Sequence, residues 1–237
     1  MIARRAALLL ACLLATPAGA EPRVMVTGEW PPYTGVEEPE GGTMTAIVRA
    51  AYSALGEEVR IGYFAWSRIR RLPQDNSDVT GSFPHYYSEE RAARCHFSDP
   101  IGSSPLGLAL RPGTTLKWTR LADLGRYRIG TVNTYSNTLE FDRLVASGRI
   151  RPVRAATDLD NLRNLVAGKV DAALIDRNVL AYLLARSPLR EEASQLRLDP
   201  RLVVVHKLYA CFPRTDKGLA ARDRFNKGLA TLQAAAP

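Results

Sequence analysis

Histidine and cysteine are scarce in this sequence, and their scarcity excludes most metal and nucleophile chemistry. The 237 residues include three His and three Cys, with no Cys-x-x-Cys pair and no His-Glu-x-x-His motif, so a zinc site has almost no ligands to draw on. The nucleophile elbow Gly-x-Ser-x-Gly, the dinucleotide fingerprint Gly-x-Gly-x-x-Gly and a phosphate-binding loop are missing as well. The sequence therefore carries no positive sign of an enzyme, and we expect no cofactor and no metal.

Long hydrophobic runs are missing beyond the first twenty residues. Those residues combine Arg4 and Arg5, an apolar run over 6–15 and the ending Ala-Gly-Ala at 18–20, which is the pattern of a secretory signal peptide. The run is much shorter than the roughly 20 residues that a membrane-spanning helix needs, which disfavours an uncleaved anchor. We therefore expect cleavage after residue 20 and a periplasmic mature protein.

A strong charge of one sign is also missing. Without Arg4 and Arg5, the 32 Lys and Arg fall to 30 against 24 Asp and Glu, and the resulting net charge of +6 is spread along the chain. No basic run interleaved with aromatic residues is present, so we expect no nucleic acid partner, although a mildly basic surface favours an anionic ligand.

Two cysteines remain once Cys12 is removed with the leader, namely Cys95 and Cys211. The periplasm is a compartment in which disulfides persist. A disulfide between the two and a pair of buried thiols are both open at this point, because the sequence does not give their separation.

The mature chain alternates short β-prone runs with amphipathic helices in two blocks. The first block has expected strands at 24–27, 59–64 and 79–83 and helices at 47–55 and 66–72. The second has expected strands at 127–132, 151–155 and 172–175 and helices at 137–146, 158–166 (capped by Asp158) and 178–184. Such alternation predicts an α/β fold in which parallel strands carry helices on both faces.

Two further segments, 97–111 and 202–212, are expected to cross between the blocks, and a final helix is expected over 219–232. Two blocks of the same design predict two lobes with a cleft between them.

One motif stands out from this background. Ser88-Glu89-Glu90-Arg91 is followed, six residues after the arginine, by Phe97-Ser98-Asp99-Pro100. Other pieces accompany it in a consistent order, namely Trp30-Pro31-Pro32-Tyr33, Gly42, Gly168-Lys169-Val170-Asp171-Ala172 with Asp176 after it, and Arg224-Phe225-Asn226-Lys227-Gly228-Leu229. On these residues the chain resembles the bacterial extracellular solute-binding proteins of family three, the periplasmic receptors that deliver amino acids and similar solutes to ABC importers.

The resemblance implies a two-lobed periplasmic-binding-protein fold of type II, a Venus flytrap in which two crossing strands join two α/β lobes. Residues 21–103 and 206–237 would form lobe 1, and residues 104–205 would form lobe 2. The partners implied are a small, carboxylate-bearing solute and an ABC transporter permease at the inner membrane, and we expect a monomer.

In the first lobe, the resemblance implies that Arg91 pairs with the α-carboxylate of the ligand, because a planar guanidinium offers two parallel donors to two carboxylate oxygens. The alternative is an exposed arginine on a charged turn. Four aromatic residues at loops or element ends are candidates to enclose the ligand or, alternatively, to pack within the lobes: Trp30, Tyr33, Trp66 and Tyr87.

In the second lobe, the resemblance places the turn of Thr134, Tyr135 and Ser136 before a helix start, where backbone N–H groups face the carboxylate. The alternative is an ordinary N-cap at Ser136 or Asn137. Asp176 would hold the ligand ammonium, and its place at the carboxyl end of a strand supports this independently. The alternative for Asp176 is again a helix N-cap.

The chain also departs from the amino-acid-binding pattern. Small hydroxyl residues before the arginine turn are replaced here by Phe83, Pro84, Tyr86 and Tyr87, which shrinks the site, so the ligand need not be a standard α-amino acid.

Two rival functions remain open. One is a dehydratase-type enzyme acting on cyclohexadienyl carboxylates, with Glu29, Glu140 or Asp176 as the general acid. The other is a ligand-sensing accessory module that reports to another protein.

Overall fold

The computed structural model describes residues 22–69, 78–133, 135–186 and 189–235. The expected signal peptide, residues 1–20, lies outside these ranges, as does Thr134. Within the described ranges no helix combines the length and the apolarity that crossing a lipid bilayer requires.

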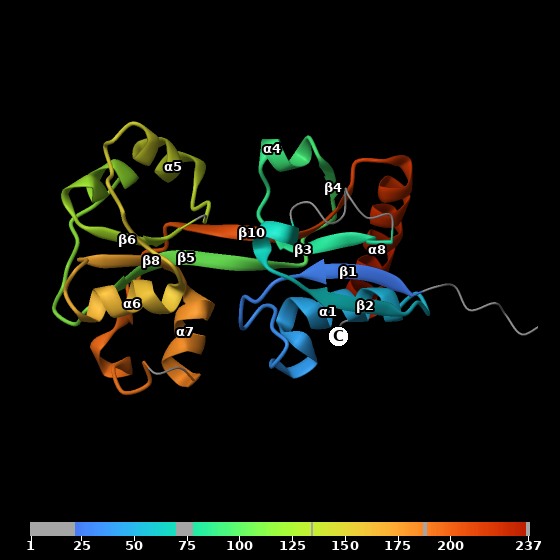
Figure 1. Ribbon diagram of the computed structural model, residues 1–237, viewed down its shortest axis with the longest axis horizontal. Helices are drawn as coiled ribbons and strands as arrows, with labels where there is room; N and C mark the ends of the chain where they lie inside the picture. Colours follow the sequence, from blue (N-terminus) through green and yellow to red (C-terminus); the bar gives the residue numbers. More distant parts are fainter. Residues whose placement is uncertain (1–21, 70–77, 134, 187–188, 236–237) are drawn as a thin grey trace, which may run out of the picture.

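The first lobe is built from both ends of the chain (Figure 1). Its strands are β1 (Arg23–Thr27), β2 (Val59–Tyr63), β3 (Gly81–His85) and β4 (Cys95–Phe97). Its helices are η1 (Pro39–Gly41), α1 (Thr43–Ser53), α2 (Trp66–Ile69), α4 (Glu89–Ala92) and α8 (Asp216–Ala235). Strand β1 pairs in parallel with β2 and β3, as the alternation of strands and helices predicts.

The second lobe repeats this design. Its strands are β6 (Ile129–Val132), β7 (Val153–Ala155), β8 (Ala172–Asp176) and β9 (Arg197–Leu198). Its helices are η2 (Leu121–Arg126), α5 (Leu139–Ala146), α6 (Asp158–Val166), α7 (Arg177–Arg186) and η3 (Ala193–Gln195). Strand β6 pairs in parallel with β7 and β8.

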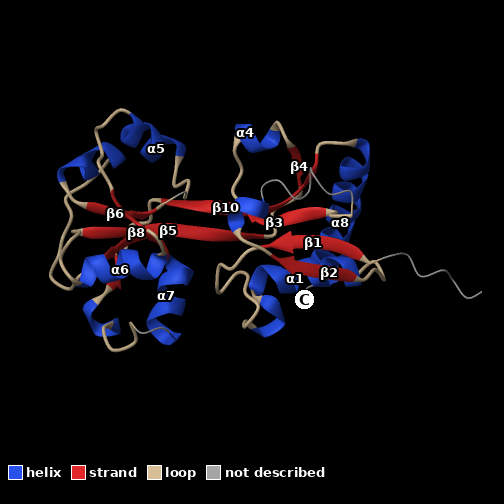
Figure 2. Cartoon of the chain, viewed as in Figure 1, coloured by secondary structure: helices blue, strands red, loops and turns tan. Residues whose placement is uncertain are grey.

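Two long strands join the lobes, β5 (Gly102–Leu110) and β10 (Val204–Pro213). They run antiparallel to each other through the middle of the molecule (Figures 1 and 2). Their far ends pair with β8 in the second lobe and with β3 and β4 in the first, giving one continuous order, β2-β1-β3-β10-β5-β8-β6-β7. The expected crossing segments are therefore confirmed as strands, and the expected lobe boundaries at 103/104 and 205/206 fall within them.

Several elements begin at residues other than those expected. Strand β3 starts at Gly81 and not at Val79, because Gly81 and Ser82 are the residues that pair with β1. Helix α6 is capped by Thr157 and not by Asp158: the Thr157 Oγ1 accepts the N–H of Asp160 at 3.1 Å. An extended threonine before the first helical residue places its hydroxyl over the third N–H of the helix, which leaves the side chain of Asp158 available for other contacts.

Helix α5 is likewise capped by Thr138, whose hydroxyl accepts the N–H of Phe141 at 2.9 Å. Neither Ser136 nor Asn137, the two residues expected as alternatives, is its N-cap.

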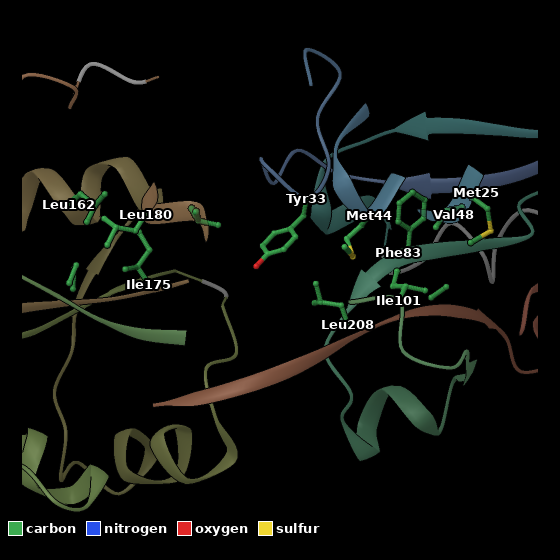
Figure 3. Close-up of a cluster of buried hydrophobic side chains, with 14 of the residues drawn as sticks. Met25, Tyr33, Met44, Val48, Phe83, Ile101, Leu162, Ile175, Leu180 and Leu208 are labelled. Carbon is green, nitrogen blue, oxygen red and sulfur yellow. The ribbon is translucent and has the colours of Figure 1, made fainter. Parts of the chain in front are cut away.

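One buried apolar cluster runs through both lobes. Figure 3 shows Tyr33 between side chains of the first lobe, such as Met44 and Phe83, and those of the second lobe, such as Ile175 and Leu180, with its hydroxyl pointing toward the second lobe. A separate cluster fills the rest of the second lobe around Leu108 and Phe141. The lobes thus share a core as well as two strands.

Of the two states open for the cysteines, the structure has the disulfide. Cys95 on β4 and Cys211 on β10 are bridged, with their Cα atoms 5.6 Å apart and a separation of 116 positions in the sequence. The disulfide links the segment that contains α4 and β4 to the crossing strand β10.

Candidate functional site

Arg91 lies at the end of the short helix α4. Ser88 caps this helix by accepting the Arg91 N–H at 3.2 Å. The guanidinium donates to the Tyr86 carbonyl, which fixes the side chain against the segment that follows β3. Burial and the nearby positive charge of Arg91 lower the pKa of His85 to about 3, and the neutral ring bonds to Ser82 at 2.8 Å. The arginine is therefore a half-buried, oriented charge and not a loose surface side chain.

Asp176 is 4% exposed at the end of β8, and its carboxylate is fully engaged. Its Oδ1 accepts the N–H groups of Asn178 and Val179 at 2.6 and 2.9 Å, which makes Asp176 the N-cap of α7. Its Oδ2 accepts the Tyr33 hydroxyl at 2.8 Å and the Ser104 hydroxyl at 2.5 Å. A carboxylate offers about four acceptor positions, and these four donors use them. The geometry matches the N-cap alternative, extended by two side-chain donors.

The hydrogen bonds of Asp176 continue across the boundary between the lobes. The Tyr86 hydroxyl lies 2.7 Å from the Ser104 hydroxyl, and the Asn178 amide donates to the Tyr33 hydroxyl at 2.9 Å. Burial and the charge of Asp176 raise the pKa of Tyr33, so the phenol stays protonated as a donor. Because Tyr33 and Tyr86 belong to the first lobe and Asp176 to the second, this network holds the lobes together.

Aromatic stacking surrounds the same network. Trp30 lies 4.6 Å from the Tyr33 ring and 6.0 Å from the Tyr86 ring, and Tyr86 stacks on His206 at 4.2 Å between centroids. His206, on β10, also bonds to the Asn137 carbonyl of the second lobe. We call this set of residues the interlobe junction: Trp30, Tyr33, Tyr86, Ser104, Asp176, Asn178 and His206.

A second contact between the lobes lies at Glu38, which precedes η1 in the segment between β1 and α1. The Tyr182 hydroxyl on α7 donates to Glu38 at 2.6 Å, and Arg186 on the same helix forms an ion pair with Glu38 at 3.3 Å. The two lobes thus meet in one joined arrangement at two separate places.

The other two aromatic candidates lie away from the junction. Trp66 packs on Gly28, where an added Cβ would lie 2.7 Å from the indole ring, and its Nε1 donates to the Glu29 carbonyl at 3.0 Å. Tyr87 is 52% exposed, with its ring against Phe97. Of the four, the structure brings only Trp30 and Tyr33 into the junction.

The turn before α5 is occupied by the protein's own carboxylate. The Ser136 hydroxyl and the Asn137 N–H donate to Asp142 at 3.0 and 3.3 Å. Asp142 therefore accepts from two donors of the segment that the resemblance assigns to the ligand carboxylate. Tyr135, 42% exposed, turns instead toward α6.

Asp158 is the residue that sequence reasoning missed as a site residue. Its Oδ2 accepts the Tyr135 hydroxyl at 3.1 Å. Burial, with a smaller contribution from the negative charge of Asp176, raises the pKa of Asp158 to about 6, against the effect of the Tyr135 bond. The charge of Asp158 in turn contributes to the raised pKa of Tyr86, across the interlobe junction. Because Thr157 and not Asp158 caps α6, the Asp158 carboxylate is left for another contact, and the sequence holds no signal that decides between the two adjacent N-cap residues.

The candidate general acids are not gathered at one place. Glu29 is exposed and accepts the N–H of Val36 at 3.1 Å, Glu140 is exposed on α5, and Asp176 has the four donors described above. Among residues 22–69, 78–133, 135–186 and 189–235, no group of three or more His, Cys, Asp or Glu is placed to hold a metal ion.

No protein-family model matches the chain. No curated protein matches it either. Solved structures do. A histidine kinase sensor domain with similarity to periplasmic binding proteins is 22% identical, with a TM-score of 0.73 over 90% of this chain and 91% of that one. The GluR0 ligand-binding core from Nostoc punctiforme, in complex with L-glutamate, is 18% identical, with a TM-score of 0.71 over 90% and 94% of the two chains. Holo ArgBP from T. maritima is 18% identical, with a TM-score of 0.68 over 90% of each chain.

These likenesses, together with the two lobes and the two crossing strands, establish the type II periplasmic-binding-protein fold. At such identities they establish the fold alone, so the function has to be argued from the residues at the interlobe junction.

Proposed function

We propose that this protein is a periplasmic solute-binding protein that captures a small, carboxylate-bearing solute between its lobes and delivers it to the permease of an ABC importer. The observation that carries the proposal is the meeting of polar and aromatic side chains from both lobes at one junction, with an oriented arginine beside it. Tyr86, whose carbonyl holds the Arg91 guanidinium, is itself a member of that junction.

Arg91 is the proposed partner of the solute carboxylate. A guanidinium carries five N–H donors in a rigid plane, and a fork of two of them matches the two oxygens of a carboxylate. The bond to the Tyr86 carbonyl sets the direction of that plane. A site that is oriented before the ligand arrives loses less conformational entropy on binding.

Contact with both lobes gives binding a mechanical consequence. A solute that contacts Arg91 in the first lobe and α6 or its neighbours in the second binds the joined arrangement of the lobes more tightly than an opened one. This difference in affinity shifts the equilibrium toward the joined arrangement. Among the similar structures, the GluR0 ligand-binding core is in complex with L-glutamate and an ancestral arginine-binding protein is bound to glutamine, so other proteins of this fold bind small carboxylates.

The solute itself need not be a standard α-amino acid. By the resemblance, Tyr86 lies where amino-acid-binding members of the family have small hydroxyl residues, and Pro84, one of the residues before it, has no N–H to donate. Asp176 has four protein donors, so an α-ammonium at that carboxylate would have to displace some of them.

Thermal-shift screening of the mature protein tests the proposal. Carboxylate-bearing solutes are expected to raise Tm. At a solute concentration of one hundred times Kd, binding adds about 2.7 kcal/mol to the free energy of unfolding. Arg91→Ala should lose this increase while the ligand-free protein keeps its fold by circular dichroism. Arg94→Ala is the matched control, because Arg94 is an exposed arginine of the same turn whose ion pair is with Glu90. An equal increase in Arg91→Ala would contradict the role of the arginine.

Uptake measurements separate an importer from a sensor. Loss of labelled-solute uptake in a strain that lacks the protein supports delivery to a permease. Unchanged uptake with a lost transcriptional response would instead support the sensing module.

A further inference from the structure

The excess positive charge of the chain after residue 20 belongs to one part of the fold. Residues 111–203, which lie between the crossing strands β5 and β10, contain 16 Lys and Arg against 10 Asp and Glu. The rest of the chain after residue 20 has 14 of each. No single block of sequence holds the excess, but the fold divides it so that the second lobe carries a net charge of +6. Such an asymmetry between two parts of a chain indicates an anionic partner for the charged part.

Within the second lobe, five basic residues belong to one edge of the sheet. The parallel strands β6, β7 and β8 begin at this edge and end at the opposite one, where Asp176 contacts the first lobe (Figure 1). The segments just before the three strands carry a set of exposed residues that we call the basic edge: Arg126, Arg128, Arg149, Arg151 and Lys169.

The pairing of the strands brings three members of the basic edge together. Arg128 directly precedes β6, and its carbonyl accepts the N–H of Asp171, which directly precedes β8, at 2.8 Å. Lys169 lies two positions before Asp171. Arg151 lies abreast of Arg128, because each lies two positions before the first residue that pairs between β7 and β6.

Helix η2 brings the other two members to the same place. Its last residue is Arg126, and Gly125 before it packs so closely on the Arg149 carbonyl that an added Cβ would clash with that oxygen. Arg149 and Arg151 belong to one short connection, between α5 and β7. The five side chains therefore start from neighbouring points of the backbone, although 43 positions of sequence separate the first from the last.

Acidic residues neutralise only part of the basic edge. Arg128 forms an ion pair with Asp171 at 2.6 Å, and Arg126 lies 4.0 Å from Asp123. Over the residues that the structure describes, no carboxylate oxygen comes within 4.0 Å of a charged nitrogen in the other three members. Three exposed cations are therefore left for an anionic partner.

Stabilisation of helix ends does not account for these cations. Arg149 and Lys169 each lie three positions beyond the last residue of a helix, α5 and α6 respectively. The attraction of a helix dipole for a cation falls off within the last turn of the helix. Arg151 precedes a strand, where no such dipole acts. The set is thus better explained by a partner outside the chain.

The chemistry of the basic edge fits the headgroups of an anionic lipid bilayer. A guanidinium donates two parallel N–H groups to two phosphate oxygens, and clusters of roughly four to eight Lys and Arg bind anionic membrane surfaces by charge. Protein interfaces are instead centred on aromatic or apolar anchors, and single-stranded nucleic acid stacks on aromatic rings. Among the described residues, the segments that carry the basic edge expose no aromatic ring and no large apolar side chain.

We propose that the basic edge binds the surface of an anionic phospholipid bilayer, with Arg149 and Arg151 as its main contacts. The contact is made by charge at the surface of the bilayer and requires no inserted helix. It is separate from the capture of a solute proposed above, because the basic edge and Asp176 lie at opposite ends of the strands of the second lobe.

Sedimentation of the mature protein with vesicles tests the proposal. The protein is expected to sediment with vesicles of phosphatidylglycerol and phosphatidylcholine in equal amounts, and to stay in solution with vesicles of phosphatidylcholine alone. Binding should be lost at about 1 M salt, because the Debye length falls to about 3 Å there.

A pair of double variants locates the contact. Arg149→Gln combined with Arg151→Gln should bind the anionic vesicles about tenfold more weakly or worse, because each charge near an anionic membrane strengthens binding about fivefold. Arg49→Gln combined with Arg60→Gln is the matched control, since it removes two exposed arginines of the first lobe and lowers the net charge equally. The control should bind as the wild type does. Circular dichroism checks that both variants are folded.

Three results would contradict the membrane contact. The first is a wild-type protein that does not sediment with the anionic vesicles. The second is an equal loss of binding in both double variants, because net charge and not the basic edge would then explain the attraction. The third is binding of polyglutamate, dependent on Arg149 and Arg151, without binding of vesicles, which would assign the edge to an acidic protein. No solute is present, so each result leaves the proposed solute-binding function untouched.

Discussion

Asp158 and Asp176 show how far the role of one residue type depends on the donors around it. Asp176 has two backbone and two side-chain donors, which together satisfy its buried carboxylate. Asp158 has one donor and a raised pKa. The four donors give Asp176 a structural role. Asp158 has a single donor, and its protonation changes with pH near neutrality.

Asp158→Asn tests this difference through stability in the absence of ligand. The pKa of Asp158 is raised from 3.8 to about 6, so the folded state binds a proton more readily than the unfolded chain does. Stability from this group is then full below pH 4, falls as the pH rises toward 6, and stays lower above it. The substitution should therefore raise the unfolding free energy by about 1–3 kcal/mol at pH 7.5 and by much less at pH 4. Chemical denaturation at the two pH values measures it, and an equal effect at both would contradict the account.

Local sequence signals predicted some of these residues and not others. Arg91 follows from its spacing to Phe97-Ser98-Asp99-Pro100, and its orientation is visible only in the contact with the Tyr86 carbonyl. The bond between Tyr33 and Asp176 joins residues 143 positions apart, a separation over which hydrophobic periodicity carries no information. Asp158 was hidden because aspartate and threonine are both good N-caps and adjoin each other here.

At the scale of elements, the periodic parts of the chain were predicted closely. Strands β1, β2 and β8 lie where apolar spacing places them, because each depends on its own face being buried. Helix α1 (Thr43–Ser53) begins four residues before the expected range of 47–55 and ends two residues before its end. Errors gather at element ends, as at β3 and α5, where pairing partners and capping hydroxyls decide the boundary. The disulfide between β4 and β10 needed coordinates, since it depends on a distance.

Glu57 makes a polar contact between the C-terminal helix α8 and the rest of the first lobe. Glu57 accepts from Arg224 on α8 at 2.5 Å and from Arg23 on β1 at 3.0 Å. Burial alone would raise the pKa of Glu57, but the bonds from Arg224 and Arg23 outweigh it and hold the pKa below its usual value. The contribution to stability is therefore present above about pH 4.5 and is lost as the pH falls.

Glu57→Gln should lower the unfolding free energy by about 1 kcal/mol at pH 7, since two charge-assisted bonds are weakened at a partly exposed position. Glu58→Gln serves as the control, because the Glu58 side chain is exposed and its backbone carbonyl supplies the contact with Arg23. Urea unfolding of both variants measures the difference. Equal stability of the two would show that the bridge contributes nothing.

At the scale of the whole molecule, two sets of side-chain contacts hold the lobes in the joined arrangement, one at Tyr33 and Asp176 and one at Glu38, Tyr182 and Arg186. The core cluster that passes through both lobes adds to them. The two-lobed plan was predictable from the repeated alternation of strands and helices. The joined arrangement was not, because it depends on contacts between distant loops.

Removing both sets of hydroxyls should open the molecule. Each interlobe hydrogen bond contributes about 0.5–1.5 kcal/mol, so Tyr33→Phe together with Tyr182→Phe should shift the balance toward separated lobes. Small-angle scattering of the ligand-free double variant is expected to give a larger radius of gyration than the wild type. Tyr87→Phe, which removes an exposed hydroxyl away from the junction, should leave it unchanged. An unchanged radius in the double variant would assign the joining of the lobes to the shared core.

Hydrogen–deuterium exchange with and without a solute identified by the thermal-shift screen tests most directly whether the ligand is held between the lobes. The expected result is slower exchange, on adding the solute, in residues 86–92 of the first lobe and in residues 135–139 and 158–161 of the second. Slower exchange in one lobe only, or at a place remote from all three segments, would contradict capture between the lobes.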